Sequence, residues 1–404
     1  MDTGLSIRRL ADAPHRLFFF LGTAGLLAAS TWWLAAMLLR HAPQLIGLDM
    51  RGMSAHLHPL IMIFGFFPFF VFGFAFTAGP RWLQMASPPT SQYLIPGIGM
   101  GCAFLSLLPA MFLGDCAIVF SLSVYACFAF ILWFRFSRLV AQSRAPEKVH
   151  ARIIQLSLGI GGLTLGAAIV GIATGREWHA IVRSAGIWGF LVPLFCTVCH
   201  RMLPFFAAGV QGSNFLWRPW WLLAALVVGA YLHGLLDFFA ATRWLWIVDG
   251  PLAFIGFTIV WRWGIVQSLR NRLLAMLHLS FVWLAIGYTL SFAQSLFAHG
   301  GVAVLGLGPM HAVSIGFLAS ITIAMVTRVT CGHSGRTLAA DGVTWVLFLI
   351  FQLVAVSRVA AELFPAYYAG FIVFASFVWF VCFGVWGWRN APIYLSRRAD
   401  GMAG

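Results

Sequence analysis

Long apolar runs separated by short polar segments repeat along this chain. A helix needs about 20 apolar residues to cross a bilayer. Because lipid offers the backbone no hydrogen-bond partner, runs of this length fold as helices. We place such runs at 17–39, 57–79, 92–113, 116–136, 153–174, 180–200, 220–240, 245–261, 272–296, 302–326, 343–364 and 366–388. The pattern predicts an all-α, polytopic membrane helix bundle with about twelve transmembrane helices.

The composition agrees with this prediction. Hydrophobic residues make up 61% of the 404 residues and charged residues 9%, and the mean hydropathy is +0.91. Soluble domains average about 25% charged residues, so we expect 1–404 to form a single integral-membrane domain. The second and sixth helices share a faint repeat, P-F-F-x-x-G, at 68–73 and 204–209. This repeat predicts close helix packing at Gly73 and Gly209.

The net charge of +14 is distributed unevenly. Of the 25 Lys and Arg, 19 fall on the side of the bundle that holds both termini and 6 on the other side. Because cytoplasmic loops of membrane proteins are rich in Lys and Arg, this asymmetry places both termini in the cytoplasm. Topology explains the basic charge, and we expect no nucleic-acid partner.

Cys196, Cys199 and His200 form the C-x-x-C-H pattern that attaches c-type haem in secreted proteins. Here the pattern lies at the cytoplasmic end of the sixth predicted helix, whereas haem is attached on the other side of the membrane. We therefore do not interpret it as a c-type haem site. We expect the 7 Cys to behave as small apolar residues.

Ionisable groups inside membrane spans are costly and therefore indicate function. The predicted helices place most of the 12 His in two layers. The outer layer holds His56, His58, His233, His299 and His311, with His41 and His179 in outer loops, and the inner layer holds His200, His278 and His333. We expect His15 and His150 to be solvated. Because imidazole suits iron, copper and zinc, each layer is a candidate cofactor site.

A haem between two helices takes one axial His from each helix at matching depth. His58 lies near the outer start of the second helix. His311 lies at a similar depth if its helix begins near residue 307, which Pro309 favours because Pro suits the first helical turn. His58 and His311 are therefore a candidate pair of haem ligands.

Other arrangements of these histidines stay open. His56 and His58 are about 200° apart around a helix and cannot both face one iron, so one of them could bind a second metal or a backbone carbonyl. His233 and Asp237 share a helix face, either as a metal ligand oriented by a carboxylate or as a plain hydrogen-bonded pair. An inner site of His278 and His333, with His200 or Cys199, competes with the outer one.

Three arginines lie at the inner ends of predicted helices or just beyond them: Arg201, Arg328 and Arg336. A guanidinium there can extend to lipid phosphate or hold a haem propionate through two parallel hydrogen bonds. Arg81 has the same two options.

Four segments carry a resemblance to a known family: "SAHLHPLIMIFGFFPFFVFGFAFTAGPRW", "HRMLPFF", "MLHLSFVWLAIGY" and "GPMHAVSIGFLASITIAMVTRVTCGHSGR". They resemble the NnrS family, bacterial inner-membrane proteins linked to denitrification and nitrosative stress and described as containing haem and copper. The resemblance implies haem b and copper as cofactors. It also implies His56, His58, His278, His311 and His333 as ligands, supported by Arg328 and Arg336. The chain departs from the family pattern at Pro59, where an acid is expected, and at His200, where a Gly is expected.

The resemblance implies a haem- and copper-binding multi-pass protein of the bacterial inner (cytoplasmic) membrane. Such a protein binds nitric oxide or reduces it as a membrane oxidoreductase, with quinol from the lipid bilayer as a candidate electron donor. Two alternatives stay open: a secondary transporter of a metal or small molecule with His ligands, and a non-catalytic haem-based sensor or assembly factor. A retained haem distinguishes the first alternative, because a carrier purifies colourless.

Overall fold

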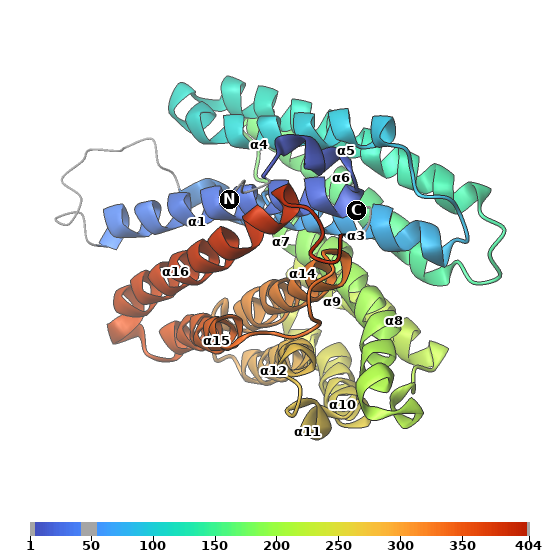
Figure 1. Ribbon diagram of the computed structural model, residues 1–404. Helices are drawn as coiled ribbons and strands as arrows, with labels where there is room; N and C mark the ends of the chain where they lie inside the picture. Colours follow the sequence, from blue (N-terminus) through green and yellow to red (C-terminus); the bar gives the residue numbers. More distant parts are fainter. Residues whose placement is uncertain (1–4, 42–54, 402–404) are drawn as a thin grey trace. The chain divides into compact units, whose positions relative to one another are not determined.

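The computed structural model describes residues 5–41 and 55–401, and every regular element in these ranges is helical (Figure 1). This confirms the predicted all-α class. In the described ranges, 11 helical segments are long and apolar enough to cross a membrane. They are Pro14–His41, His58–Trp82, Thr90–Leu113, Asp115–Gln142, Val149–Thr174, His179–Gln211, Trp220–Phe238, Arg272–His299, Gly308–His333, Gly342–Leu363 and Pro365–Leu395.

The remaining predicted segment, 245–261, forms the shorter helix α10 (Trp246–Arg262) of 17 residues. It runs antiparallel to α12 (Arg272–His299). Asp249 at the start of α10 bonds to Ser291 late in α12, and Trp263 just after α10 lies against His278 early in α12. The chain therefore returns through α10 between α9 and α12, and at 17 residues α10 is shorter than each of the 11 candidate spans.

The chain divides into two compact units. Unit 1 comprises 1–186, 330–337 and 383–404, and unit 2 comprises 187–329 and 338–382. Two helices, α14 (Ser320–His333) and α16 (Tyr368–Leu395), contribute residues to both units. Each unit is described by itself.

Unit 1 contains the N-terminal helices. They are α1 (Pro14–His41), α2 (His58–Phe64), α3 (Phe67–Trp82), α4 (Leu94–Leu113), α5 (Asp115–Gln142), α6 (Val149–Thr174) and α7 (His179–Arg183), preceded by the short η1 (Ile7–Ala11). α4 and α5 run side by side, as do α5 and α6 (Figure 1). The Ser6 backbone N–H donates to the Leu395 carbonyl over 2.9 Å. Both ends of the described chain therefore meet at one end of unit 1.

Unit 2 contains α8 (Val192–Gln211), α9 (Trp220–Phe238), α10, α11 (Ile265–Ser268), α12, α13 (Gly308–His311) and α15 (Gly342–Leu363). Two of its spans include a π-helical turn: η5 (Ser184–Leu191), whose first three residues belong to unit 1, and η8 (Ala312–Ala319). π-helical turns are rare and often mark functional sites. Both turns carry the tripeptide Gly-Phe-Leu, at 189–191 and 316–318.

Three sequence predictions about local geometry can be compared with the structure. α13 begins at Gly308 with Pro309 in its first turn, which confirms the late helix start. A Cβ on Gly73 would lie 2.7 Å from the Phe19 ring, so the predicted close packing there is also confirmed. At Gly209 the prediction is wrong, because a Cβ there would have no neighbour within 4 Å.

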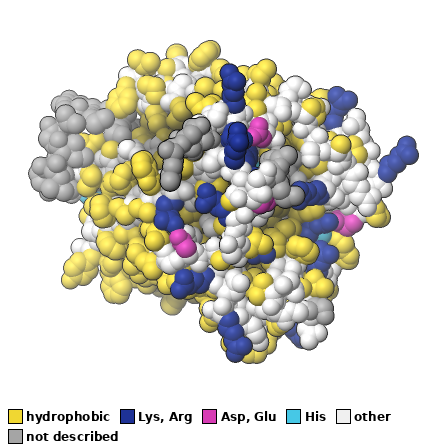
Figure 2. All heavy atoms as spheres, viewed as in Figure 1, with side chains coloured by type: hydrophobic (Ala, Val, Ile, Leu, Met, Phe, Trp, Pro, Cys, Tyr) yellow, Lys and Arg dark blue, Asp and Glu magenta, His cyan; other side chains and the backbone are white. Residues whose placement is uncertain are grey.

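The outer faces of the helices are apolar, as a lipid environment requires. Leu113, Leu163, Phe254 and Trp261 are each more than 70% exposed. Figure 2 shows apolar side chains over much of the visible face, with acidic side chains at only a few points. The structure is that of a multi-pass membrane protein.

Candidate functional site

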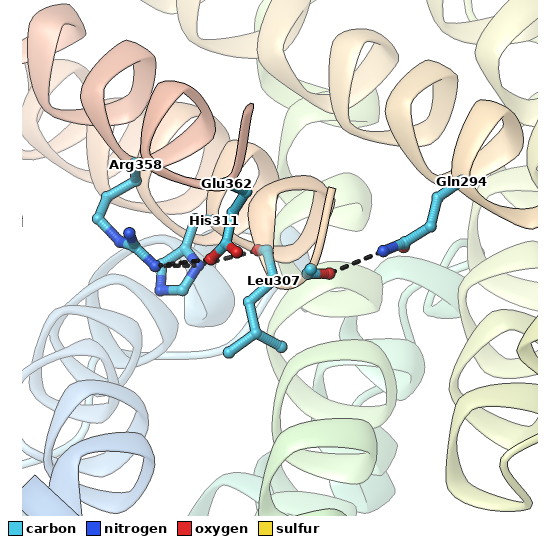
Figure 3. Close-up of polar contacts among 6 residues, drawn as sticks. Gln294, Leu307, His311, Arg358 and Glu362 are labelled. Carbon is cyan, nitrogen blue, oxygen red and sulfur yellow. Dashed lines mark hydrogen bonds and ion pairs between the residues drawn. The ribbon is translucent and has the colours of Figure 1, made fainter. Parts of the chain in front are cut away.

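His311 lies in unit 2 at the start of a span, directly before the π-helical turn η8. Its Nδ1 lies 2.9 Å from the Leu307 carbonyl oxygen (Figure 3). Because a carbonyl can only accept, Nδ1 carries the ring proton and the lone pair lies on Nε2. The ring is thus fixed in the tautomer that ligates a metal through Nε2.

Arg358, on α15, lies next to this ring and is 8% exposed. Its Nη2 is 3.4 Å from His311 Nδ1 and 3.4 Å from Glu362 Oε1. Nδ1 cannot both donate to Leu307 and accept from Arg358, and the shorter contact decides in favour of Leu307. The Nη1 of Arg358 is buried without a hydrogen-bond partner. A buried guanidinium thus keeps an unused donor beside an oriented imidazole.

Glu362 and Gln294 hold the loop that precedes α13. The Gln294 side-chain amide donates to the carbonyls of Val304 and Gly306 over 2.9 and 2.8 Å, and Figure 3 draws one of these two hydrogen bonds. A Cβ on Gly306 would overlap the Glu362 carboxylate, and the backbone there has φ +39°. Only glycine suits this position, and the loop fixes where α13 begins.

A second polar group in unit 2 connects α9, α10 and α12. His233 Nδ1 lies 2.8 Å from Asp249 Oδ1, and the Ser291 hydroxyl donates to Asp249 Oδ2 over 2.6 Å. Asp249 is 0% exposed. The carboxylate that orients His233 is therefore Asp249 and not Asp237, which corrects the sequence prediction. Asp249 has no helical spacing to His233 and was missed, although an acid near the end of an apolar run is a signal for such a role.

Two aromatic residues enclose His233. The Trp188 ring, in η5, has its centroid 3.6 Å from that of His233, and the Tyr288 ring lies at 6.2 Å. Tyr288 is fully buried and its hydroxyl has no hydrogen-bond partner. The two π-helical turns therefore adjoin the two oriented imidazoles of unit 2, His311 and His233.

In unit 1, His58 and His56 are in different surroundings. His58 begins α2 and stacks on Trp33 at a centroid distance of 3.7 Å. His56 is exposed, and its ring lies 4.0 Å from that of His179. Burial, and then the nearby charge of His179, hold the pKa of His56 below its ordinary value. The predicted pairing of His58 with His311 joins residues of different units and stays a prediction.

His179 has partners at both ring nitrogens. Its Nδ1 lies 2.6 Å from Glu177 Oε1 and its Nε2 lies 3.2 Å from the His56 carbonyl oxygen. Hydrogen bonds from the backbone and the ring of His179 lower the pKa of Glu177. Hydrogen bonds within the protein therefore fix the orientation of the His179 ring beside His56.

The predicted inner site receives little support from unit 2. His278 is buried with Nδ1 3.0 Å from the Leu274 carbonyl and Nε2 3.0 Å from the Trp263 carbonyl, so neither nitrogen is turned toward a ligand. His200 Nε2 lies 3.2 Å from the Pro219 carbonyl. Cys196 and Cys199 are buried thiols inside α8. This arrangement does not favour His278 as a ligand.

The predicted arginines lie in different units and in different surroundings. In unit 2 the Arg328 guanidinium lies over the Phe206 ring at 3.8 Å, and Arg201 is half-buried on α8. In unit 1 Arg336 is exposed, and His333 lies with its ring 4.5 Å from that of His15. His15 and His150 are 6% and 1% exposed, so the prediction that they are solvated is wrong.

A metal ion can also be bound by several protein side chains that come together at one place. Within 5–41 and 55–401, no three His, Cys, Asp or Glu side chains come together as a metal site. The described residues thus offer single oriented imidazoles rather than a complete ligand set.

The comparisons with known proteins agree with the architecture. The family model NnrS, described as NnrS protein, matches residues 9–398. A search of curated proteins gave no match. The chain belongs to the NnrS family and is a membrane protein linked to the nitric oxide response.

Proposed function

We propose that this member of the NnrS family binds haem b through His311 and binds nitric oxide at that haem within the membrane-spanning region. One observation carries the proposal: an imidazole fixed in the ligating tautomer lies beside a buried guanidinium with an unused donor. Both residues belong to unit 2.

His311 meets the requirements of an axial ligand. Metal-bound histidines usually donate their other ring N–H to a carbonyl or carboxylate, which fixes the tautomer and raises the basicity of the ligating nitrogen. The Leu307 carbonyl takes this role for His311. Because Leu307 directly precedes α13, the helix start and the ring orientation are coupled.

Arg358 would hold a propionate of the same haem. A charge at the centre of a membrane helix costs about 3 kcal/mol in insertion measurements, so buried arginines are paired or functional. Glu362, at 3.4 Å, compensates the charge of Arg358 only in part. A carboxylate would accept a hydrogen bond from the unpartnered Nη1. The residues present therefore fit a haem.

The bound haem would supply an iron that takes a diatomic ligand. Nitric oxide is small and apolar and reaches such a site through the lipid. The chain would contribute an apolar environment, His311 as the oriented ligand and the Arg358 guanidinium as the partner of a propionate. His233 holds a proton on Nδ1 against Asp249. We propose this buried pair as the group that would hold a proton if two nitric oxide molecules are reduced to nitrous oxide and water with two protons and with two electrons from a quinol in the bilayer.

Copper does not fit the described residues in the same way. They bring no three ligands together, and His233 and His311 each have Nδ1 engaged by a protein oxygen. Copper at His56, His58, His233 or His311 stays a prediction of the resemblance and the sequence pattern, and we derive no step through it.

The test is the visible spectrum of the detergent-purified protein, oxidised, reduced, and reduced with nitric oxide. We expect a Soret band that shifts with nitric oxide in the wild type and in His299→Ala, a matched control at an exposed histidine of the same unit. His311→Gly should lose the band and regain it with added imidazole. Arg358→Ala should retain less haem per protein than Arg358→Lys. A wild-type spectrum in His311→Gly would refute the assignment, and a colourless wild type from haem-supplied cells would refute the function.

A further inference from the structure

Among the buried imidazoles in the described ranges, His15 has a ring nitrogen that makes no hydrogen bond or ion pair. It is 6% exposed, and its Nδ1 is the unpartnered atom. The ring of His333 lies tilted beside it, with centroids 4.5 Å apart. Both residues belong to unit 1, and neither belongs to the site described above. An unsatisfied buried polar atom of this kind requires an explanation.

The surroundings of His15 are held in place by the C-terminal segment. The Arg16 guanidinium donates to the carbonyls of Tyr394 and Ser396 over 3.1 and 2.7 Å. The Ala399 N–H donates to the Ser334 carbonyl over 2.8 Å. The start of α1, the end of α14 and the end of α16 therefore form one fixed frame around the two imidazoles.

The charges that act on His15 are all positive: Arg16, Arg81 and Arg398, with His333 when it is protonated. Arg16 is engaged by the two carbonyls. Arg398 donates to Asp400 over 2.6 and 3.0 Å, which raises the pKa of Arg398. No hydrogen bond or ion pair joins the exposed Arg81 side chain to another described residue.

The nearby acids do not balance these cations. Asp400 is taken by Arg398, and Asp12 lies 3.6 Å from Arg9. A metal ion is disfavoured here, because the neighbouring arginines outnumber the acids and would repel it. An anion is favoured, because an imidazole N–H, a guanidinium and the N-terminus of the 28-residue helix α1 lie at the same end of unit 1.

We infer that this end of unit 1 binds a phosphate group, which accepts hydrogen bonds from His15 Nδ1 and from Arg81. A phosphate has enough acceptor oxygens for both donors and for His333. Two sources share this chemistry: the headgroup of an anionic phospholipid, which basic pockets between membrane helices bind, and free inorganic phosphate.

The experiment compares full-length wild type with Arg81→Gln, His15→Phe and the control Arg138→Gln. Arg138 is an exposed arginine on α5, so its replacement removes the same charge elsewhere in unit 1. One arm measures by native mass spectrometry how much phosphatidylglycerol is retained from nanodiscs of phosphatidylglycerol and phosphatidylcholine. The other arm measures binding of inorganic phosphate to delipidated protein by equilibrium dialysis.

For a lipid headgroup we expect retention of phosphatidylglycerol to fall about tenfold in Arg81→Gln and His15→Phe, and to stay unchanged in Arg138→Gln. For free phosphate we expect the same loss in the dialysis arm instead. If Arg81→Gln and Arg138→Gln behave alike in both arms, the inference is wrong. Because Arg81 is exposed, its replacement leaves the fold intact, so this outcome is decisive even if His15→Phe is unstable.

Discussion

Replacing Asp249 by Ala removes the carboxylate that accepts hydrogen bonds from two buried donors, His233 and Ser291. The carboxylate accepts from His233 Nδ1 over 2.8 Å and from the Ser291 hydroxyl over 2.6 Å, and Asp249 is 0% exposed. Each hydrogen bond to a charged group contributes about 1.5–3 kcal/mol. Breaking one partner of a buried pair costs about 3–5 kcal/mol, because the other partner stays buried and unpaired. We therefore expect Asp249→Ala to lower the free energy of unfolding by about 3 kcal/mol or more.

Asp249→Asn distinguishes the hydrogen bonds from the charge. The amide oxygen can still accept from Ser291, and the amide nitrogen can donate to Nδ1 once His233 moves its proton to Nε2. We expect this variant to lie within about 1 kcal/mol of the wild type. It should nevertheless lose any ligand at Nε2, because that nitrogen is then protonated.

The assay is equilibrium unfolding in mixed micelles of increasing dodecyl sulfate, with a double-mutant cycle between His233→Phe and Asp249→Ala. A coupling energy of about 1.5 kcal/mol or more is expected for a contact of this kind. The matched control is Asp237→Ala on α9, the helix that carries His233, with an expected loss of unfolding free energy below about 1 kcal/mol. A coupling energy under about 0.5 kcal/mol, or a loss of unfolding free energy in Asp237→Ala larger than that in Asp249→Ala, would refute the reasoning.

Three further predictions rest on single contacts. A Cβ on Gly287 would overlap Val313 Cγ2, so Gly287→Ala should lower the free energy of unfolding by about 1–3 kcal/mol in the same assay. Gly209→Ala, with open space around it, should be neutral or stabilise by up to about 1 kcal/mol. Equal effects would contradict the packing. Tyr288→Phe removes a buried hydroxyl that has no partner and should stabilise the protein by about 1 kcal/mol, so a clear loss would mean that the hydroxyl binds a group of its own. The pKa of His56 is lowered, so diethyl pyrocarbonate should still modify His56 at a pH below the pKa of an ordinary histidine, about 6.5. Glu177→Gln should move the pH midpoint of this modification lower still, because the Glu177 charge raises the pKa of His56. A midpoint that moves upward in Glu177→Gln would contradict that sign.

The helices could be predicted because a single physical constraint determines them. A run of about 20 apolar residues in lipid must satisfy its own backbone, and only a helix does so within one segment. The start of α13 was predictable for a similarly local reason, since Pro is favoured in the first turn of a helix. α10 was also found, although its 17 residues are few for a bilayer span.

The partners of the histidines could not be predicted, because they come from packing between helices. Spacing along α9 favoured Asp237 for His233, yet the bond is made by Asp249 on the neighbouring helix. His15 was expected in solvent, but it is buried, and the neighbouring Arg16 donates to carbonyls at the end of α16 and just after it. The π-helical turns have no sequence signal apart from the shared Gly-Phe-Leu, and six residues in an apolar chain are weak evidence.

The abundance of histidines indicates function only after the partners of each ring are known. His278 and His179 have protein oxygens at both nitrogens, which uses the ring as a structural bridge. His311 and His233 have an acceptor at Nδ1, which leaves the lone pair on Nε2 and is the preparation that a metal ligand needs. His15 has an unsatisfied nitrogen among cations, which is the preparation that an anion needs. The same side chain can thus be prepared for three roles, and the partners of both ring nitrogens together with the sign of the neighbouring charges distinguish them.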